Sequence, residues 1–212
     1  MMLGIIGSGT MGKVLRAAAE EEGTFDQIVV MEPLSEEPWS RIRPDLLIDF
    51  SHPQAIGRVY DYCREKGGNI PVVLAATGYG SEEEKLIQLL EKICPVMRSS
   101  NFSRGMHVMS EICSLAEKRM GAECDIRLTE IHHTKKKDHP SGSAVQLCRV
   151  LGMDPADESK VQSLRMGNVC GQHRVYFALE DEILEICHTA MSKKIFAIGA
   201  LEAGKKLMKE LT

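Results

Sequence analysis

Three glycines near the amino terminus, spaced Gly7-x-Gly9-x-x-Gly12, constrain the possible folds of this chain more than any other feature. They follow the apolar run 3–6 and precede a stretch with apolar residues at helical spacing. Between a strand and a helix, such glycines allow a tight turn, a close approach of backbone to a pyrophosphate and close helix packing. The first turn of the helix also offers free N–H groups to phosphates. The spacing predicts a βαβ unit that binds a dinucleotide through Gly7, Ser8, Gly9, Thr10, Met11 and Gly12.

Glu32 lies at the end of the next predicted strand, 27–31. A carboxylate at that position can accept hydrogen bonds from the adenosine ribose of the dinucleotide. Pro33 follows, and no arginine stands beside Glu32 to bind a 2′-phosphate. The sequence therefore favours NADH over NADPH, although Arg41 or Arg43 leaves NADPH open.

Strands and helices alternate through the first half of the chain. Apolar runs at 3–6, 27–31, 45–50, 70–75 and 95–97 are separated by helical segments. Such alternation is typical of parallel βαβ units with helices on both faces of the sheet. The fold class predicted for this half is α/β, a Rossmann-type dinucleotide-binding domain.

The pattern changes after Arg104. A predicted helix at 105–120 is followed by strands at 125–131, 160–166, 174–179 and 183–188, and an amphipathic helix at 199–211 ends the chain. The period-two alternation of these strands indicates a sheet with one covered face and one face that is exposed or paired with another subunit. We expect residues 1–103 and 197–212 to form the dinucleotide-binding domain, and 104–196 to form an inserted α+β domain for substrate binding and oligomerisation.

Composition narrows the class of protein. The chain has 212 residues, 43% of them hydrophobic, and a net charge of −4, which argues against a general nucleic-acid binder. No apolar run is long enough to span a membrane, and the amino terminus lacks the features of a signal peptide. The seven cysteines are scattered without a Cys-x-x-Cys pair, which suits reduced thiols better than disulfides or a zinc site. We expect a cytoplasmic protein without a bound metal.

The segment 130–144 gathers proton donors, cations and a helix start. Its sequence is Glu-Ile-His-His-Thr-Lys-Lys-Lys-Asp-His-Pro-Ser-Gly-Ser-Ala. Ser141 is a predicted N-cap, so the amides near Gly142 and Ser143 would form an anion site next to the lysines. His132 or His133, titrating near neutral pH, could supply a proton. For Lys135 and Lys137 we favour a solvated turn, but the whole segment predicts a site for a small polyanion.

This segment resembles the signature of the 4-hydroxy-tetrahydrodipicolinate reductases, also called dihydrodipicolinate reductases. The resemblance covers nearly the whole chain and also includes Asp49-Phe-Ser51, Ala76-Thr-Gly78, Asn101-Phe-Ser103, Gly171-Gln-His173, His188 and Phe196-Ala-x-Gly-Ala200. It implies that His132 is the general acid and that Lys136 assists protonation and binds a substrate carboxylate. It also implies that the dicarboxylate substrate is bound by His133, Ser141, Gly142 and Ser143.

The resemblance implies further contacts with the dinucleotide, made by Phe50, Ser51, Ala75, Thr77, Ser100, Asn101 and Phe102. The family reduces its substrate with NADH or NADPH in the diaminopimelate and lysine pathway, and its members suggest a homotetramer built through the smaller domain. Hydride transfer from the nicotinamide would be followed by protonation of the substrate.

Several positions depart from the family pattern. Ser143 replaces a threonine, His139 an alanine and Lys193 an arginine, and Ala75-Ala76 replaces Gly-Thr. Two other functions therefore stay open. A dehydrogenase for a different small acid would keep the glycine loop and Glu32, and a non-catalytic NAD-binding sensor would keep cofactor affinity without turnover.

Overall fold

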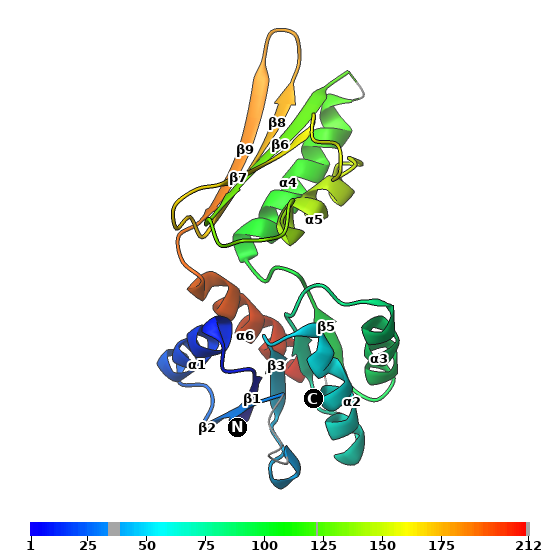
Figure 1. Cartoon of the computed structure of the whole chain (residues 1–212), viewed down its shortest axis with the longest axis vertical. Helices are drawn as coiled ribbons and strands as arrows, with labels where there is room; N and C mark the ends of the chain where they lie inside the picture. The colour runs from blue at the N-terminus through cyan, green and yellow to red at the C-terminus, as the bar shows by residue number, and fades with distance from the viewer. Residues whose placement is uncertain (34–38, 122, 211–212) are drawn as a thin grey trace. The chain divides into compact units, whose positions relative to one another are not determined.

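The computed structural model describes residues 1–33, 39–121 and 123–210, and the chain divides into two compact units (Figure 1). Unit 1 comprises Met1–Phe102 and Lys194–Thr212, and unit 2 comprises Ser103–Lys193. The second unit is thus an insertion between the last strand and the last helix of the first.

Unit 1 is built on a five-stranded parallel sheet in the order β2-β1-β3-β4-β5. Its strands are β1 (Met2–Ile6), β2 (Gln27–Met31), β3 (Leu46–Asp49), β4 (Val72–Leu74) and β5 (Val96–Arg98). Its helices are α1 (Thr10–Glu22), the short 3-10 turns η1 (Trp39–Arg41) and η2 (Pro53–Ala55), α2 (Ile56–Glu65), α3 (Ser81–Glu91) and α6 (Lys194–Lys209).

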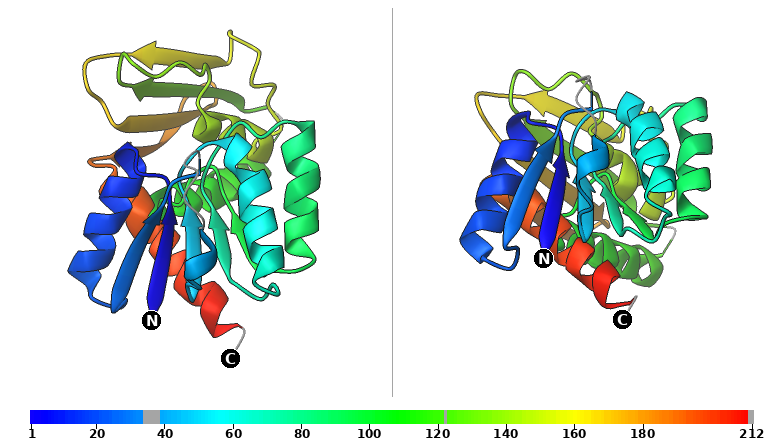
Figure 2. Two further views of the ribbon diagram at one scale, coloured as in Figure 1. Left: turned by 60° about the horizontal axis from the view of Figure 1, so that its bottom comes forward. Right: turned by 90° about the horizontal axis from the view of Figure 1, so that it is seen from below.

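Helices cover both faces of this sheet (Figure 2). Leu3 and Ile5 of β1 pack against α1 and α6, whereas Ile6 belongs to the core formed with α2 and α3. A strand buried on both faces has to be apolar throughout, as the run 3–6 is. The predicted Rossmann-type α/β fold is confirmed.

Helix α6 begins at Lys194, earlier than the start predicted at 199, and residue 211 of that prediction lies outside the described residues. The glycine taken as the helix start lies inside the helix instead. A Cβ at Gly199 would come within 1.7 Å of the carbonyl oxygen of Phe102, so glycine is needed there for close packing.

Unit 2 is a mixed four-stranded sheet in the order β7-β6-β8-β9. Its elements are α4 (Arg104–Met120), β6 (Asp125–His132), α5 (Gly142–Val150), β7 (Val161–Arg165), β8 (Gly171–Ala178) and β9 (Ile183–Ala190). Strands β6 and β7 are parallel, and the other pairs are antiparallel. Helices α4 and α5 form a core with one face of the sheet, around Leu128, Val175 and Phe177. This is the second, α+β part of the predicted fold.

The helices within the described ranges are all too short or too polar to cross a membrane.

Candidate active site

A row of polar side chains crosses the covered face of the unit 2 sheet. Glu130 of β6 pairs with Ser163 of β7 on one side and with His173 of β8 on the other, and His173 pairs with His188 of β9. Glu130 is fully buried and His173 is 3% exposed. Burying polar groups this deeply costs free energy unless they are hydrogen-bonded or ion-paired. The partners of these side chains therefore indicate their role.

Two serines at helix starts contact this row. The Oγ of Ser141 accepts a hydrogen bond from the backbone of Ala144 at 3.3 Å and lies 3.0 Å from Nε2 of His173. Ser103 caps α4 in the same way and lies 3.3 Å from Nε2 of His188. The predicted N-cap at Ser141 is confirmed. Burial, and then the charge of His132, lowers the pKa of His173 to about 3, so this imidazole is neutral at pH 7.

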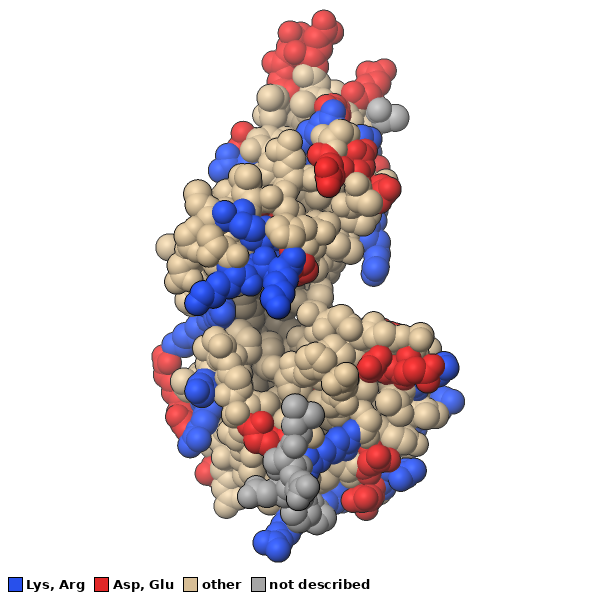
Figure 3. Space-filling model, in the orientation of Figure 1, with Lys and Arg blue, Asp and Glu red and all other residues tan. Residues whose placement is uncertain are grey.

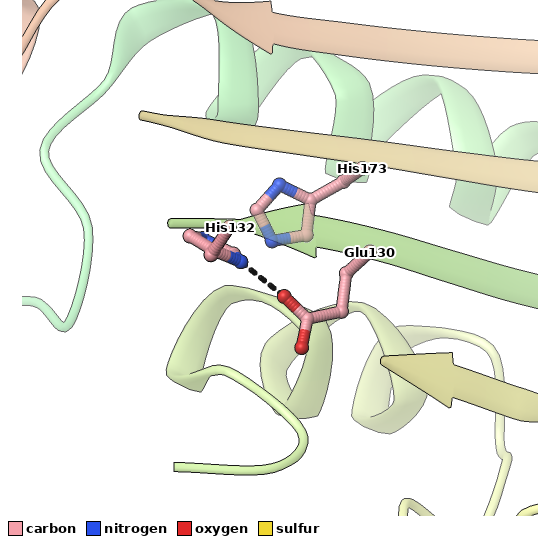
Figure 4. Close-up of side chains that lie close together, drawn as sticks. All are labelled: Glu130, His132 and His173. Carbon is pink, nitrogen blue, oxygen red and sulfur yellow. Dashed lines mark ion pairs between the residues drawn. The ribbon is translucent and has the colours of Figure 1, made fainter. Parts of the chain in front are cut away.

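The imidazole of His132 and the carboxylate of Glu130 are in contact, shielded from solvent, at the end of β6 (Figure 4). The contact joins Nδ1 of His132 to Oε2 of Glu130, and Arg165 binds the other oxygen, Oε1, at 2.9 Å. Burial raises the pKa of Glu130, but interactions with His132, Ser163 and Arg165 outweigh it and bring that pKa down to about 2. The carboxylate is therefore a fixed negative charge behind the imidazole.

Glu130, His132 and His173 each offer a ligand atom within 4.8 Å of the others, a spacing that could hold a metal ion. Arg165 already binds Glu130, however, and its guanidinium charge opposes a cation at the same place. The ring of His132 also lies edge-on to that of His173, with centroids 5.2 Å apart. The cluster therefore fits acid–base chemistry better than metal binding.

Basic residues surround the loop that follows His132. Lys136 pairs with Asp138 at 2.8 Å, and Figure 3 shows Lys and Arg side chains gathered over the carboxyl ends of β6 and β7. Burial lowers the pKa of His133, and the charges of Lys193, His132, Lys136 and Arg165 lower it further. The loop leads into α5, whose first turn begins at Gly142. Cations and helix N–H groups thus meet where the substrate site is predicted.

Unit 1 carries the predicted dinucleotide residues at the carboxyl ends of its parallel strands, which is where such sheets bind ligands. A cavity of about 540 Å³ lies there, and Met11, Phe50, Ser51, Ala75 and Thr77 are among its lining residues. Glu32, Ser100 and Asn101 lie at the ends of β2 and β5, outside this lining. Phe102 packs in the core of unit 1, so only its backbone is available to a ligand.

The glycine loop has the geometry that a pyrophosphate needs. Gly7 has a φ of +99°, and a Cβ at Gly12 would lie 1.9 Å from the carbonyl oxygen of Gly7. A Cβ at Gly9 would meet nothing within 4 Å, and no side chain caps α1 there. Oε1 of Glu32 is buried and has no hydrogen-bond partner among the described residues. These features fit a dinucleotide, and the carboxylate of Glu32 could accept a hydrogen bond from a ribose hydroxyl.

Comparison with known proteins decides the family. The model for the dihydrodipicolinate reductase C-terminus matches residues 105–212, and the model for the N-terminus matches residues 33–102. The 4-hydroxy-tetrahydrodipicolinate reductase of Thermosipho africanus is 35% identical over 210 residues, which cover 98% of this chain and 92% of that protein. The chain belongs to the dihydrodipicolinate reductase family. The reductase of Alkaliphilus metalliredigens is 31% identical, with 97% of this chain and 92% of that protein covered.

A solved dihydrodipicolinate reductase from a Paenisporosarcina species has the same fold. It superposes with a TM-score of 0.75 at 18% identity, covering 99% of this chain and 95% of that one. That protein was solved with dipicolinate bound. The predicted family and fold are therefore confirmed, and the protein is a member of an oxidoreductase family.

The dihydrodipicolinate reductase signature contains some of the residues that cluster at this site but not all of them. The motif contains Glu130, His132 and Lys136, which lie in one cluster with Arg165. Sequence reasoning gave Arg165 no role, and His173 only a place in a C-terminal pattern. The signal for His173 was its match to Gly171-Gln-His173, whereas Arg165 carried no motif.

Proposed function

We propose that this protein reduces 4-hydroxy-tetrahydrodipicolinate to tetrahydrodipicolinate with NADH or NADPH, in diaminopimelate and lysine biosynthesis. The observation that carries the proposal is the buried pair of His132 and Glu130 beside a basic loop and the start of α5. This arrangement supplies a proton donor next to a site for carboxylates, in a chain of this family.

The dinucleotide binds to the glycine loop and to Glu32. The N–H groups of Thr10, Met11 and Gly12, at the start of α1, would hold the pyrophosphate. The carboxylate of Glu32 accepts from the ribose, which favours NADH over NADPH. Phe50, Ser51, Ala75 and Thr77 surround the nicotinamide side, and Ser100, Asn101 and Phe102 contribute from the end of β5. When bound, the reduced nicotinamide supplies the hydride.

The substrate is a cyclic dicarboxylate held by unit 2. His133, Lys136 and the N–H groups at Ser141, Gly142 and Ser143 bind its carboxylates, with Lys193 close enough to His133 to add a charge. Lys136 and Asp138 are partly exposed, at 22% and 55%, so their pair is weak and a substrate carboxylate can displace Asp138. The dipicolinate bound to the related structure supports this class of ligand.

His132 completes the reaction as the general acid. A bound reduced nicotinamide would supply hydride to the unsaturated ring that remains after loss of water, and His132 would donate the proton to the resulting enamine carbon. Lys136 assists by neutralising the carboxylate beside it. General acid catalysis of this kind contributes about 10²- to 10⁴-fold to the rate.

We further propose that the protein is a cytoplasmic homotetramer joined through the uncovered face of the unit 2 sheet. Leu164 and Ile183 have their side chains on that face and are 52% and 63% exposed. The cysteines are all free thiols, which fits a reducing compartment. Light scattering of the purified protein measures the oligomeric state, and a monomer would contradict this part of the proposal.

The decisive experiment follows the loss of NADH absorbance with enzymatically generated 4-hydroxy-tetrahydrodipicolinate, in parallel with NADPH. The variants His132→Gln and Lys136→Met should lose most of the turnover while NADH binding is retained. The matched control is Lys135→Met, in the same loop, which should stay close to the parent. NADH binding without turnover would indicate a sensor, and turnover of another small acid would indicate a different dehydrogenase.

A further inference from the structure

Arg165 connects the two residues to which the proposed function gives catalytic roles. Its Nη2 binds Oε1 of Glu130 at 2.9 Å, and Oε2 of Glu130 binds Nδ1 of His132. Its Nε donates to the carbonyl oxygen of Lys136 at 3.3 Å, and Nη2 also donates to the carbonyl oxygen of Asp138. One guanidinium is therefore tied both to the carboxylate behind His132 and to the backbone that carries Lys136.

These contacts are shielded from solvent. The side chain of Glu130 is fully buried, and those of His132 and Arg165 are 10% and 12% exposed. Ion pairs are weakly screened in such an environment, and an unpaired carboxylate is costly there. The register of β6 and β7 also holds these side chains in place, because Glu130 lies opposite Ser163 and His132 lies opposite Arg165 on the two paired strands. The positions of Glu130, His132 and Arg165 are therefore set by the sheet.

A fixed carboxylate at Nδ1 determines which nitrogen of His132 reacts. The contact favours a proton on Nδ1, so the proton that can leave is the one on Nε2. Gly171 lies at that end of the ring, where a Cβ would be 3.0 Å from Nε2.

We propose that Glu130 and Arg165 are positioning residues: Glu130 fixes the proton of His132 on Nδ1, and Arg165 holds that carboxylate and the Lys136 backbone in one arrangement. The catalytic part of this inference rests on the proposed function, whereas the state of the imidazole does not. Neither residue has to touch the substrate.

The first test is independent of activity. Long-range proton–nitrogen NMR spectra of protein labelled at histidine nitrogens report the tautomer of each neutral ring, and His132→Gln assigns the signal. In the parent protein His132 should carry its proton on Nδ1, and Glu130→Gln should shift it toward a mixture with the Nε2 form. A parent His132 protonated on Nε2 would overturn the proposal without any variant having to fold.

The second test is kinetic. Glu130→Gln should lower kcat by about 10- to 100-fold, a part of what general acid catalysis contributes, with KM changed by less than about threefold. Arg165→Lys should also lower kcat, since an ammonium cannot bridge the carboxylate and two carbonyls as a guanidinium does.

The matched control is Glu185→Gln, which removes a carboxylate bound to Arg174 at 3.1 Å on the same sheet but outside the site. It should leave kcat and the tautomer of His132 unchanged. A purely structural role for Glu130 would lower the folded fraction but leave the kcat of the folded protein and the tautomer of His132 as in the parent. If the parent protein shows no turnover, the proposed function is wrong, and the tautomer measurement still decides the role of Glu130.

Discussion

The hydroxyl of Ser141 serves two partners at once, because its Oγ accepts from the backbone of Ala144 and lies 3.0 Å from Nε2 of His173. Since the oxygen accepts from the helix, its proton is free to be donated to the ring. His173, which is neutral at pH 7, presents Nε2 to this hydroxyl. The start of α5 and the polar row of the sheet are joined at this one atom.

Substitution of Ser141 by Ala should therefore destabilise unit 2 more than the loss of an ordinary cap. Loss of an N-cap costs about 1 kcal/mol, and a buried ring nitrogen left without a partner costs about 1–3 kcal/mol more. Urea unfolding measures the sum. The control is Ser159→Ala, an exposed serine next to Asp157, which should change stability by less than about 0.5 kcal/mol. Equal effects of the two substitutions would contradict the double role.

The contribution of His173 to stability should fall as the pH is lowered from 7 to 5. The pKa of His173 is about 3 in the folded protein against 6.5 for a free histidine, so the unfolded chain binds a proton in this window and the folded chain does not. The stability from neutral His173 is thus complete above about pH 6.5 and is lost toward pH 3. The loss is at most about 1.4 kcal/mol per pH unit.

Glu130 acts in the same direction at lower pH. Its folded pKa of about 2 lies below the ordinary 4.5, so its contribution is present above 4.5 and is lost as the pH falls below it. Urea unfolding at pH 7 and pH 5 separates the two groups, since only the histidine titrates between them. His173→Gln should flatten the pH dependence in that range, and an unchanged slope would count against a neutral buried His173.

A methyl group at position 171 should lower turnover without affecting the dinucleotide. The Cβ of Gly171→Ala would lie 3.0 Å from Nε2 of His132, so the ring has to shift by a few tenths of an ångström. Misplacement of a catalytic group by about 1 Å can cost about 10²-fold, and this smaller shift should cost about 10-fold in kcat. NADH titration checks that cofactor affinity is unchanged. Gly57→Ala, where the nearest atom is 3.8 Å away, is the control.

Substitutions of Gly9, just before α1, and of Gly12, in its first turn, should have different effects. Gly12→Ala places a Cβ 1.9 Å from the carbonyl oxygen of Gly7, so it should lower both stability and NADH affinity. Gly9→Ala meets no protein atom within 4 Å, so it should fold normally but weaken NADH binding by about 10-fold or more, since its methyl group enters the space of the pyrophosphate. Calorimetric titration and thermal unfolding together separate the two outcomes. Normal NADH binding by Gly9→Ala would contradict the proposed position of the cofactor.

Local signals made most of the fold predictable. The glycine loop, the apolar strands and the cap at Ser141 each depend on neighbours within a few residues, and the structure has them all. The start of α6 was wrong because Gly199 was interpreted as a helix boundary, when its role is a close approach to Phe102 that no local pattern reveals.

The role of Arg165 could not be predicted for a related reason. Strand alternation places it on the face shared with Val161, but its contact with Glu130 depends on how β7 is aligned with β6. That register is decided by parallel pairing between segments about thirty residues apart, across an intervening helix. The motif 130–144 therefore contained the proton donor and the lysine but not the residue that joins them.

Arg165 contacts both Glu130 and the loop after β6, so the two ends of the segment 130–165 lie together, held by the pairing of β6 with β7. The length of the stretch between α5 and β7 is then free to vary, because the alignment of the two strands sets the distance between its ends. Insertions or deletions in the exposed part of this stretch should then leave the proton donor in place. A shift of β7 by a single residue along β6 would separate the guanidinium from the carboxylate and turn its side chain to the opposite face.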